Sequence, residues 1–191
     1  LVALLMGASF AFGQITKPSF NRWSVDLAAG ANKAVIDYGP TFGQSLFNIG
    51  GINAGARYML NPNFGFEFEL GLERFQDGKA NPDFATNYGR SSLQGVANLG
   101  NIFSFYTWTE RFSVLAHAGI GLSSMRADGF NFFEKGNVDR IGNLIFGLTP
   151  QFKINDRLAL NLDASMVNHG RQSRTFDYSA KVPHGGLNAY F

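Results

Sequence analysis

Alternation between apolar and polar residues is the feature that most constrains the fold of this chain. Between Phe64 and Glu73, phenylalanine and leucine occupy every even position, while glycine and glutamate occupy every odd one. Successive side chains of a β-strand point to opposite faces, so this segment has one apolar face and one acidic face. The pattern recurs in at least six segments, joined alternately by tight turns and long polar connections. This arrangement predicts a closed membrane barrel.

Reading the alternation along the chain predicts an all-β fold, an eight-stranded antiparallel transmembrane β-barrel with up-and-down connections. The expected strands cover residues 22–31, 49–60, 64–73, 92–105, 112–123, 142–153 and 158–168, and a truncated last strand begins at residue 187. Alternation is weakest in the fourth expected strand, 92–105. The apolar faces of the other complete strands carry no charged residue, as lipid exposure requires, because lysine or arginine at the bilayer midplane costs about 2 to 4 kcal/mol. The lipid-facing residues are expected to include Phe64, Phe66, Phe68, Leu70, Leu144, Phe146, Leu148, Leu160 and Leu162.

The connections distinguish the two ends of the predicted barrel. Tight turns at 61–63 and 155–157 and a short connection at 106–111 alternate with polar loops at 32–47, 76–91, 126–140 and 170–186. Outer-membrane barrels have short periplasmic turns and long outer loops, so the polar loops are expected outside the cell. An aromatic girdle at the short-turn end is expected to include Trp23, Tyr58, Tyr106 and Trp108.

The polar faces of the strands predict a charged interior. A turn centred on Pro62 sets Arg57 opposite Glu67, with Glu69 next along the same face. Asp26 and Asp163 project into the same interior. Eight strands enclose a space that side chains fill, so an ion-pair network is expected. The alternative is a small solute pore, in which Arg57 switches between carboxylate partners.

Composition excludes several kinds of chemistry. The chain has no cysteine, which rules out disulfides and thiolate ligands, and its net charge of +2 is too small to indicate nucleic acid. No cofactor, metal site or catalytic residue is expected. His117, which faces inward between glycines, is interpreted as a packing residue. His169 and Ser173 leave open a lipid-modifying enzyme, which is disfavoured because both lie at the start of a loop. A soluble lipid-binding barrel is a further alternative.

The first thirteen residues, from Leu1 to Gly13, form an apolar run with small residues at its end. A membrane-spanning helix needs about 20 apolar residues, so this run is interpreted as a partial signal peptide cleaved before Gln14. The remainder, 14–191, is then one outer-membrane barrel domain, incomplete at its C-terminus. A buried N-terminal strand or helix is the alternative.

Three segments carry a family resemblance: Ser-Leu-Gln-Gly-Val-Ala-Asn-Leu-Gly at 92–100, Leu-Ala-His-Ala-Gly-Ile-Gly at 115–121, and the segment 148–158 around Asn155-Asp156-Arg157. Together with the order of elements, they resemble the OmpA-like outer-membrane barrels, especially those of Bacteroidetes. The resemblance implies insertion in a Gram-negative outer membrane, with its lipid as partner and a structural envelope role. In many members the last strand leads to a periplasmic domain that binds peptidoglycan, so peptidoglycan is an expected partner through such a domain. The sequence does not identify ligands of the outer loops.

Overall fold

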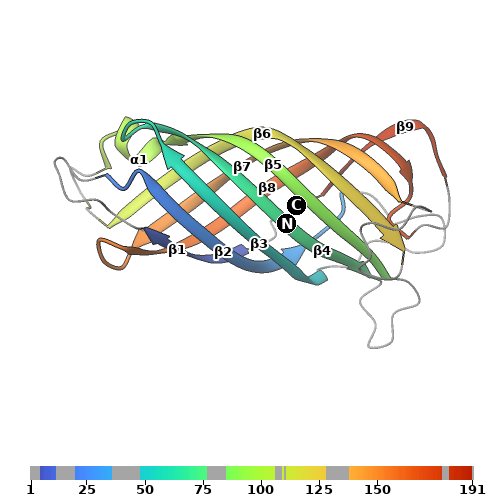
Figure 1. The fold of residues 1–191 in the computed structure, drawn as a ribbon, viewed down its shortest axis with the longest axis horizontal. Helices are drawn as coiled ribbons and strands as arrows, with labels where there is room; N and C mark the ends of the chain where they lie inside the picture. The colour runs from blue at the N-terminus through green and yellow to red at the C-terminus, as the bar shows by residue number, and fades with distance from the viewer. Residues whose placement is uncertain are drawn as a thin grey trace.

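The computed structural model describes residues 5–11, 20–35, 48–76, 85–105, 109, 111–127, 138–177 and 181–190. These residues form a nine-stranded sheet and one short helix (Figure 1). The strands are β1 (Leu5–Ala11), β2 (Trp23–Asn32), β3 (Asn48–Met59), β4 (Phe64–Gln76), β5 (Ala85–Asn98), β6 (Phe112–Ala127), β7 (Asp139–Lys153), β8 (Leu158–Arg174) and β9 (Lys181–Tyr190). The helix α1 (Leu99–Ile102) follows β5. No helix in the described part of the chain is long and apolar enough to cross a membrane.

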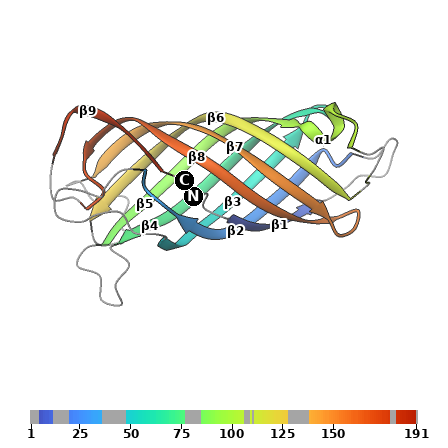
Figure 2. The same cartoon turned by 180° about the vertical axis from the view of Figure 1, so that it is seen from behind.

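Strands β2 to β8 form an antiparallel meander in which each strand pairs with the next along the chain. The two opposite views show these tilted strands wrapping around a common axis (Figures 1 and 2). Beyond the meander, β8 has two neighbours on its other side. Residues 158–163 of β8 pair with β1, and residues 167–174 pair with β9. Because β1 also pairs with β2, hydrogen-bonded strands follow one another around the axis.

The additional strand β1 lies within the segment interpreted as a signal peptide. Its register sets Met6 opposite Ala29 of β2 and Leu162 of β8. The described residues therefore contain one strand more than the eight expected, and the segment has the strand conformation that was the alternative. Pairing does not test whether the segment is removed on export, so the signal peptide stays a prediction.

Two tight turns define the short-turn rim, the end of the barrel that also carries α1. In one turn, the side-chain oxygen of Asn61 accepts hydrogen bonds from the backbone N–H groups of Asn63 and Phe64, at 2.8 and 2.9 Å. In the other, Asn155 accepts from Arg157 and Leu158 at 2.8 and 2.9 Å. Asparagine stabilises such turns because its side chain replaces a backbone acceptor. The opposite end is the long-loop rim.

The expected fourth strand, 92–105, is wrong at both ends. β5 ends at Asn98, whose side chain accepts a hydrogen bond from the N–H of Asn101 at 3.1 Å and caps α1. β5 also begins earlier, at Ala85, and pairs with β4 along residues 85–97. Its first residues lack apolar alternation because small or polar residues, Ala85, Asn87, Gly89 and Ser91, occupy the outward parity there. Backbone pairing does not require alternation, so the pattern missed this half of the strand.

The connections at the long-loop rim are shorter than expected, again because strands pair through their backbones without needing apolar alternation. β8 continues to Arg174 and β9 begins at Lys181, so most of the expected loop 170–186 is strand. β5 likewise occupies 85–91 of the expected loop 76–91. Residues 36–47, 77–84, 128–137 and 178–180 of the expected loops lie outside the described residues.

Glycine in β6 permits a close approach between strands. A Cβ added at Gly119 would overlap the carbonyl oxygen of Leu93 and lie 2.5 Å from the Cα of Gln94. At Gly142 in β7, an added Cβ would meet no atom within 4 Å. Backbone atoms cannot move aside without disturbing the β5–β6 ladder.

We therefore expect Gly119→Ala to lower the free energy of unfolding by about 1 to 3 kcal/mol, the usual cost of overpacking. Gly142→Ala is the matched control and should leave stability unchanged. Urea unfolding in detergent micelles, followed by tryptophan fluorescence, measures both. Equal stability of the two variants would contradict the close strand approach at Gly119.

Candidate functional site

The outer surface of the meander is a wall rich in large apolar side chains. Eight of the nine residues assigned to lipid are exposed, with Phe68 at 49% and Leu144 at 59% of their full accessibility. The eight are Phe64, Phe66, Phe68, Leu70, Leu144, Phe146, Leu148 and Leu160. The ninth, Leu162, is half-buried, and its Cα partner is Met6 of β1. Large apolar side chains outside a sheet indicate a surrounding apolar medium or a partner surface.

Aromatic side chains lie at the short-turn rim of this wall. The rings of Trp23 and Tyr58, on the paired strands β2 and β3, have centroids 4.8 Å apart. Phe105 stacks between Phe103 and Phe112 at 6.5 and 6.4 Å. Two residues assigned to the girdle, Tyr106 and Trp108, lie outside the described residues.

The interior at mid-height contains the ion pairs. The β3–β4 register sets Arg57 opposite Glu67, the pair expected from the turn at Pro62, and Arg57 Nε lies 2.9 Å from Glu67 Oε2. Arg57 Nη2 lies 2.9 Å from Asp26 Oδ2. The Arg57 side chain is only 7% exposed. Asn161 donates to the other oxygen of Asp26 at 3.1 Å. Arg57 thus has two carboxylate partners at once, from β2 and β4.

A second buried arginine, Arg90 of β5, holds the remaining glutamates of β4. Its Nη2 lies 2.8 Å from Glu69 Oε1 and 3.7 Å from Glu73 Oε1. Glu73 also accepts hydrogen bonds from Tyr190 at 3.0 Å and Asn32 at 3.3 Å. Sequence reasoning missed Arg90 because it placed this residue in a loop. Alternation of Arg90, Ser92 and Gln94 on one parity was the available signal.

Asp163 joins a third group and not the Arg57 pairs. Its Oδ2 lies 3.0 Å from Nε2 of His117 and accepts from the Thr149 hydroxyl at 2.6 Å. The Ser165 hydroxyl also donates to Asp163. Nδ1 of His117 lies 2.6 Å from Oε1 of Gln94. His117 is therefore a hydrogen-bonded member of the network that links β5, β6 and β8.

Towards the long-loop rim the interior contains an apolar and aromatic cluster, with the side chains of His169 and Asn143 hydrogen-bonded to the Tyr88 hydroxyl. The buried cluster contains Ala34, Phe75, Tyr88, Met125, Ile141, Ile145, Val167, Phe176 and Tyr190. Phe75 lies at its centre, with ring centroids 5.8 Å from Tyr88, 4.7 Å from Phe176 and 5.3 Å from Tyr190. We call these nine residues the aromatic plug. They fill the end of the barrel above the ion pairs, and three of them, Ala34, Tyr88 and Phe176, lie in segments predicted as loops.

Among the described interior residues the cavities are small except at the short-turn rim. A cavity of about 40 Å³ lies among the ionic residues, between Asp26, Arg57 and Asp163. Another of about 20 Å³ lies beside Glu73, Arg90 and Tyr190. A wider cavity of about 270 Å³ opens at the short-turn rim. The cavities of about 40 and 20 Å³ have room for only a few water molecules. The described side chains around the ion pairs are therefore closely packed.

The histidine and serine of the enzyme alternative, expected at the start of a loop, both lie in β8, and each has other hydrogen-bond partners. His169 is fully buried, with Nε2 2.9 Å from the Tyr88 hydroxyl and Nδ1 2.7 Å from Oε1 of Gln172. Ser173 is exposed, and its backbone N–H donates to Asp139 at 2.6 Å. Both ring nitrogens of His169 already have partners. A base that activates a hydroxyl must reach it, and among the described residues His169 contacts Tyr88 and Gln172.

No group of three histidine, aspartate or glutamate residues in the described ranges is arranged to hold a metal ion. The carboxylates of the interior face arginine, histidine and hydroxyl groups. What the arrangement provides is cross-linking of strands: Arg57 connects β2, β3 and β4, and Arg90 connects β4 and β5.

No protein-family model matches the chain, and no curated protein matches it. Among solved structures, the chain is similar to Ail, the attachment invasion locus protein of Yersinia pestis, with a TM-score of 0.44 and 12% sequence identity. The superposition covers 99% of this chain and 92% of that one. Function is therefore inferred from the residues of this chain.

Proposed function

We propose that this chain is an outer-membrane β-barrel protein with a structural role in a Gram-negative envelope. One observation carries the proposal: the polarity of the wall is inverted, with phenylalanine and leucine outside and ion pairs inside. A soluble protein buries its large apolar side chains, whereas a membrane barrel exposes an apolar band and keeps polar residues in its interior. A wall of strands with an apolar outside is consistent with location in the outer membrane.

The proposal includes a closed wall with eight strand positions. An open edge within lipid would leave backbone N–H and C=O groups without partners, at several kcal/mol each. The pairing of β8 with β1 along one half and with β9 along the other supports an eighth position between β8 and β2.

Cell fractionation tests the location of the protein in the outer membrane. Recovery of the protein in the periplasmic fraction would favour the soluble lipid-binding alternative.

A structural role is favoured over a solute pore because the interior is packed. The ion pairs occupy mid-height and the aromatic plug fills the long-loop end. The two cavities beside the ion pairs, of about 40 and 20 Å³, have room for only a few water molecules.

We therefore expect no steady single-channel current when the purified barrel is reconstituted in planar bilayers. Heat-modifiable migration of the same sample on gels is the control, because it shows that the silent protein is folded. A steady current that scales with salt concentration would instead support the pore, with Arg57 moving between its carboxylate partners.

The resemblance to OmpA-like barrels alone supports a finer role, anchoring the membrane to peptidoglycan. The native protein, purified from the outer membrane of its source cells, provides the test. An intact mass well above 20.9 kDa together with retention on peptidoglycan sacculi would support tethering. Failure to bind sacculi would remove the tether and leave the barrel proposal in place.

A further inference from the structure

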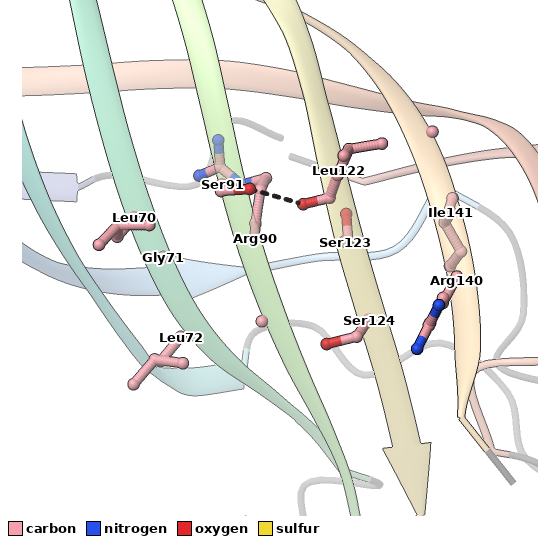
Figure 3. A pocket seen from close by; sticks show the side chains of 12 residues that line it. Leu70, Gly71, Leu72, Arg90, Ser91, Leu122, Ser123, Ser124, Arg140 and Ile141 are labelled. Carbon is pink, nitrogen blue, oxygen red and sulfur yellow. Dashed lines mark hydrogen bonds between the residues drawn. The ribbon is translucent and has the colours of Figure 1, made fainter. Parts of the chain in front are cut away.

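An apolar hollow of about 570 Å³ lies in the outer wall, across β4 to β7 (Figure 3). Two cross-strand rows of outward residues border it. The first row is Leu70, Ser91, Leu122 and Gly142, and the second, nearer the long-loop rim, is Leu72, Gly89, Ser124 and Arg140. Glycine and serine lie between the leucines, so the surface is recessed there. The Ser91 hydroxyl lies 3.4 Å from the carbonyl oxygen of Leu122, to which it donates.

Arginines lie at the long-loop side of the hollow. Arg140 is exposed and lines it directly. One row further out, Arg74 of β4 and Arg126 of β6 are both Cα partners of Asn87 on the intervening strand β5. The guanidinium group of arginine matches the geometry of phosphate and binds it by paired hydrogen bonds.

The order of these features follows the order of groups in a membrane lipid. Moving from the long-loop rim towards mid-membrane, the wall offers first positive charge and then an apolar recess. A lipid of the outer leaflet presents its phosphate at the interface and its acyl chains deeper. The hollow's volume is within the range of ligand pockets, about 300 to 1,000 Å³.

We infer that this hollow binds a phosphorylated lipid of the outer leaflet, with an acyl chain between the leucines and a phosphate against Arg140. The inference rests on the proposed function, because a lipid reaches the hollow only when this wall lies in the membrane with the long-loop rim outward. Charge complementarity at Arg140 selects this occupant over a neutral lipid or a second copy of the barrel.

The test is native mass spectrometry of the folded barrel in dodecyl maltoside micelles, with bis-phosphorylated lipid A as the probe. Arg140→Ala should lower retention of lipid A about tenfold, as expected for the loss of one charge-assisted contact. Gly142→Leu should also lower retention of lipid A, because the leucine side chain occupies part of the hollow. A Cβ added at this position meets no atom within 4 Å, so the substitution itself causes no clash. Lipid A without its phosphates should bind the unchanged protein and Arg140→Ala equally weakly.

Matched controls separate this site from general effects on the wall. Arg157→Ala removes an exposed arginine at the short-turn rim. Gly95→Leu adds the same side chain to the outward face of β5 outside the hollow, where an added Cβ makes ordinary contact at 3.8 Å. Both controls should retain lipid A as the unchanged protein does.

Three results would overturn the inference: unchanged retention in Arg140→Ala and Gly142→Leu, equal retention of phosphatidylcholine by the unchanged protein, or a dimer that Gly142→Leu separates. Folded protein in the outer-membrane fraction would keep the proposed function intact in each case. Recovery of the unchanged protein from the periplasm would instead remove the proposed function itself.

Discussion

Phe68→Arg is expected to prevent stable insertion of the barrel in the outer membrane. Phe68 lies in the middle of β4, is 49% exposed, and is flanked on the neighbouring strands by Ala56 and Leu93. A guanidinium group at that depth meets hydrocarbon, at a cost of about 2 to 4 kcal/mol near the bilayer midplane. Loss of the lipid-facing phenylalanine adds to this cost. The amount of heat-modifiable protein in outer-membrane fractions is the measurement.

Phe64→Arg is the matched control, because it makes the same change on the same face of the same strand. Phe64 is the first residue of β4, next to the turn at Asn61, where an arginine reaches the interface and costs about 0 to 1 kcal/mol. This variant should insert at near-normal levels. Equal insertion of the two variants would contradict the assignment of the exposed wall to lipid, because the cost of arginine in a bilayer depends on its depth.

Arg57→Ala should have the largest effect on stability among interior variants. It leaves Asp26 and Glu67 side by side in the lumen without the cation that lies 2.9 Å from each. Removing one member of a buried ion pair typically costs about 3 to 5 kcal/mol, because the remaining charge is left uncompensated. Urea unfolding in micelles measures the loss.

Glu67→Ala provides a graded comparison with Arg57→Ala. Arg57 keeps Asp26 as partner in this variant, so a smaller loss of about 1 to 3 kcal/mol is expected. The double variant Arg57→Ala/Glu67→Ala should lose less than the sum of the two single losses. An exposed pair, Lys153 and Asp156 at the turn of β7 and β8, is the control, and Lys153→Ala should change stability little. Additive losses at Arg57 and Glu67 would show that the two side chains are not coupled.

Particular residues show how far alternation alone describes this protein. From Phe64 to Glu73 it predicted the strand, both faces and the register with β3, because each parity has one chemical character and Pro62 marks a tight turn. Between Ala85 and Ser91 it failed, because the outward residues there are small or polar and the strand is recognised only by its pairing with β4. The helix α1 was missed too, since its signal is a single capping asparagine.

Local alternation and one tight turn were enough to predict the polarity of the wall, most strand positions and the pairing of Arg57 with Glu67, because these signals depend only on neighbouring residues. The partners of Arg90, Asp163 and His117, the aromatic plug and the hollow beside Arg140 become visible only in the folded chain. These contacts join strands that are neighbours around the barrel or across its interior and are separated along the chain. Their formation depends on strand tilt and register, which no single segment encodes.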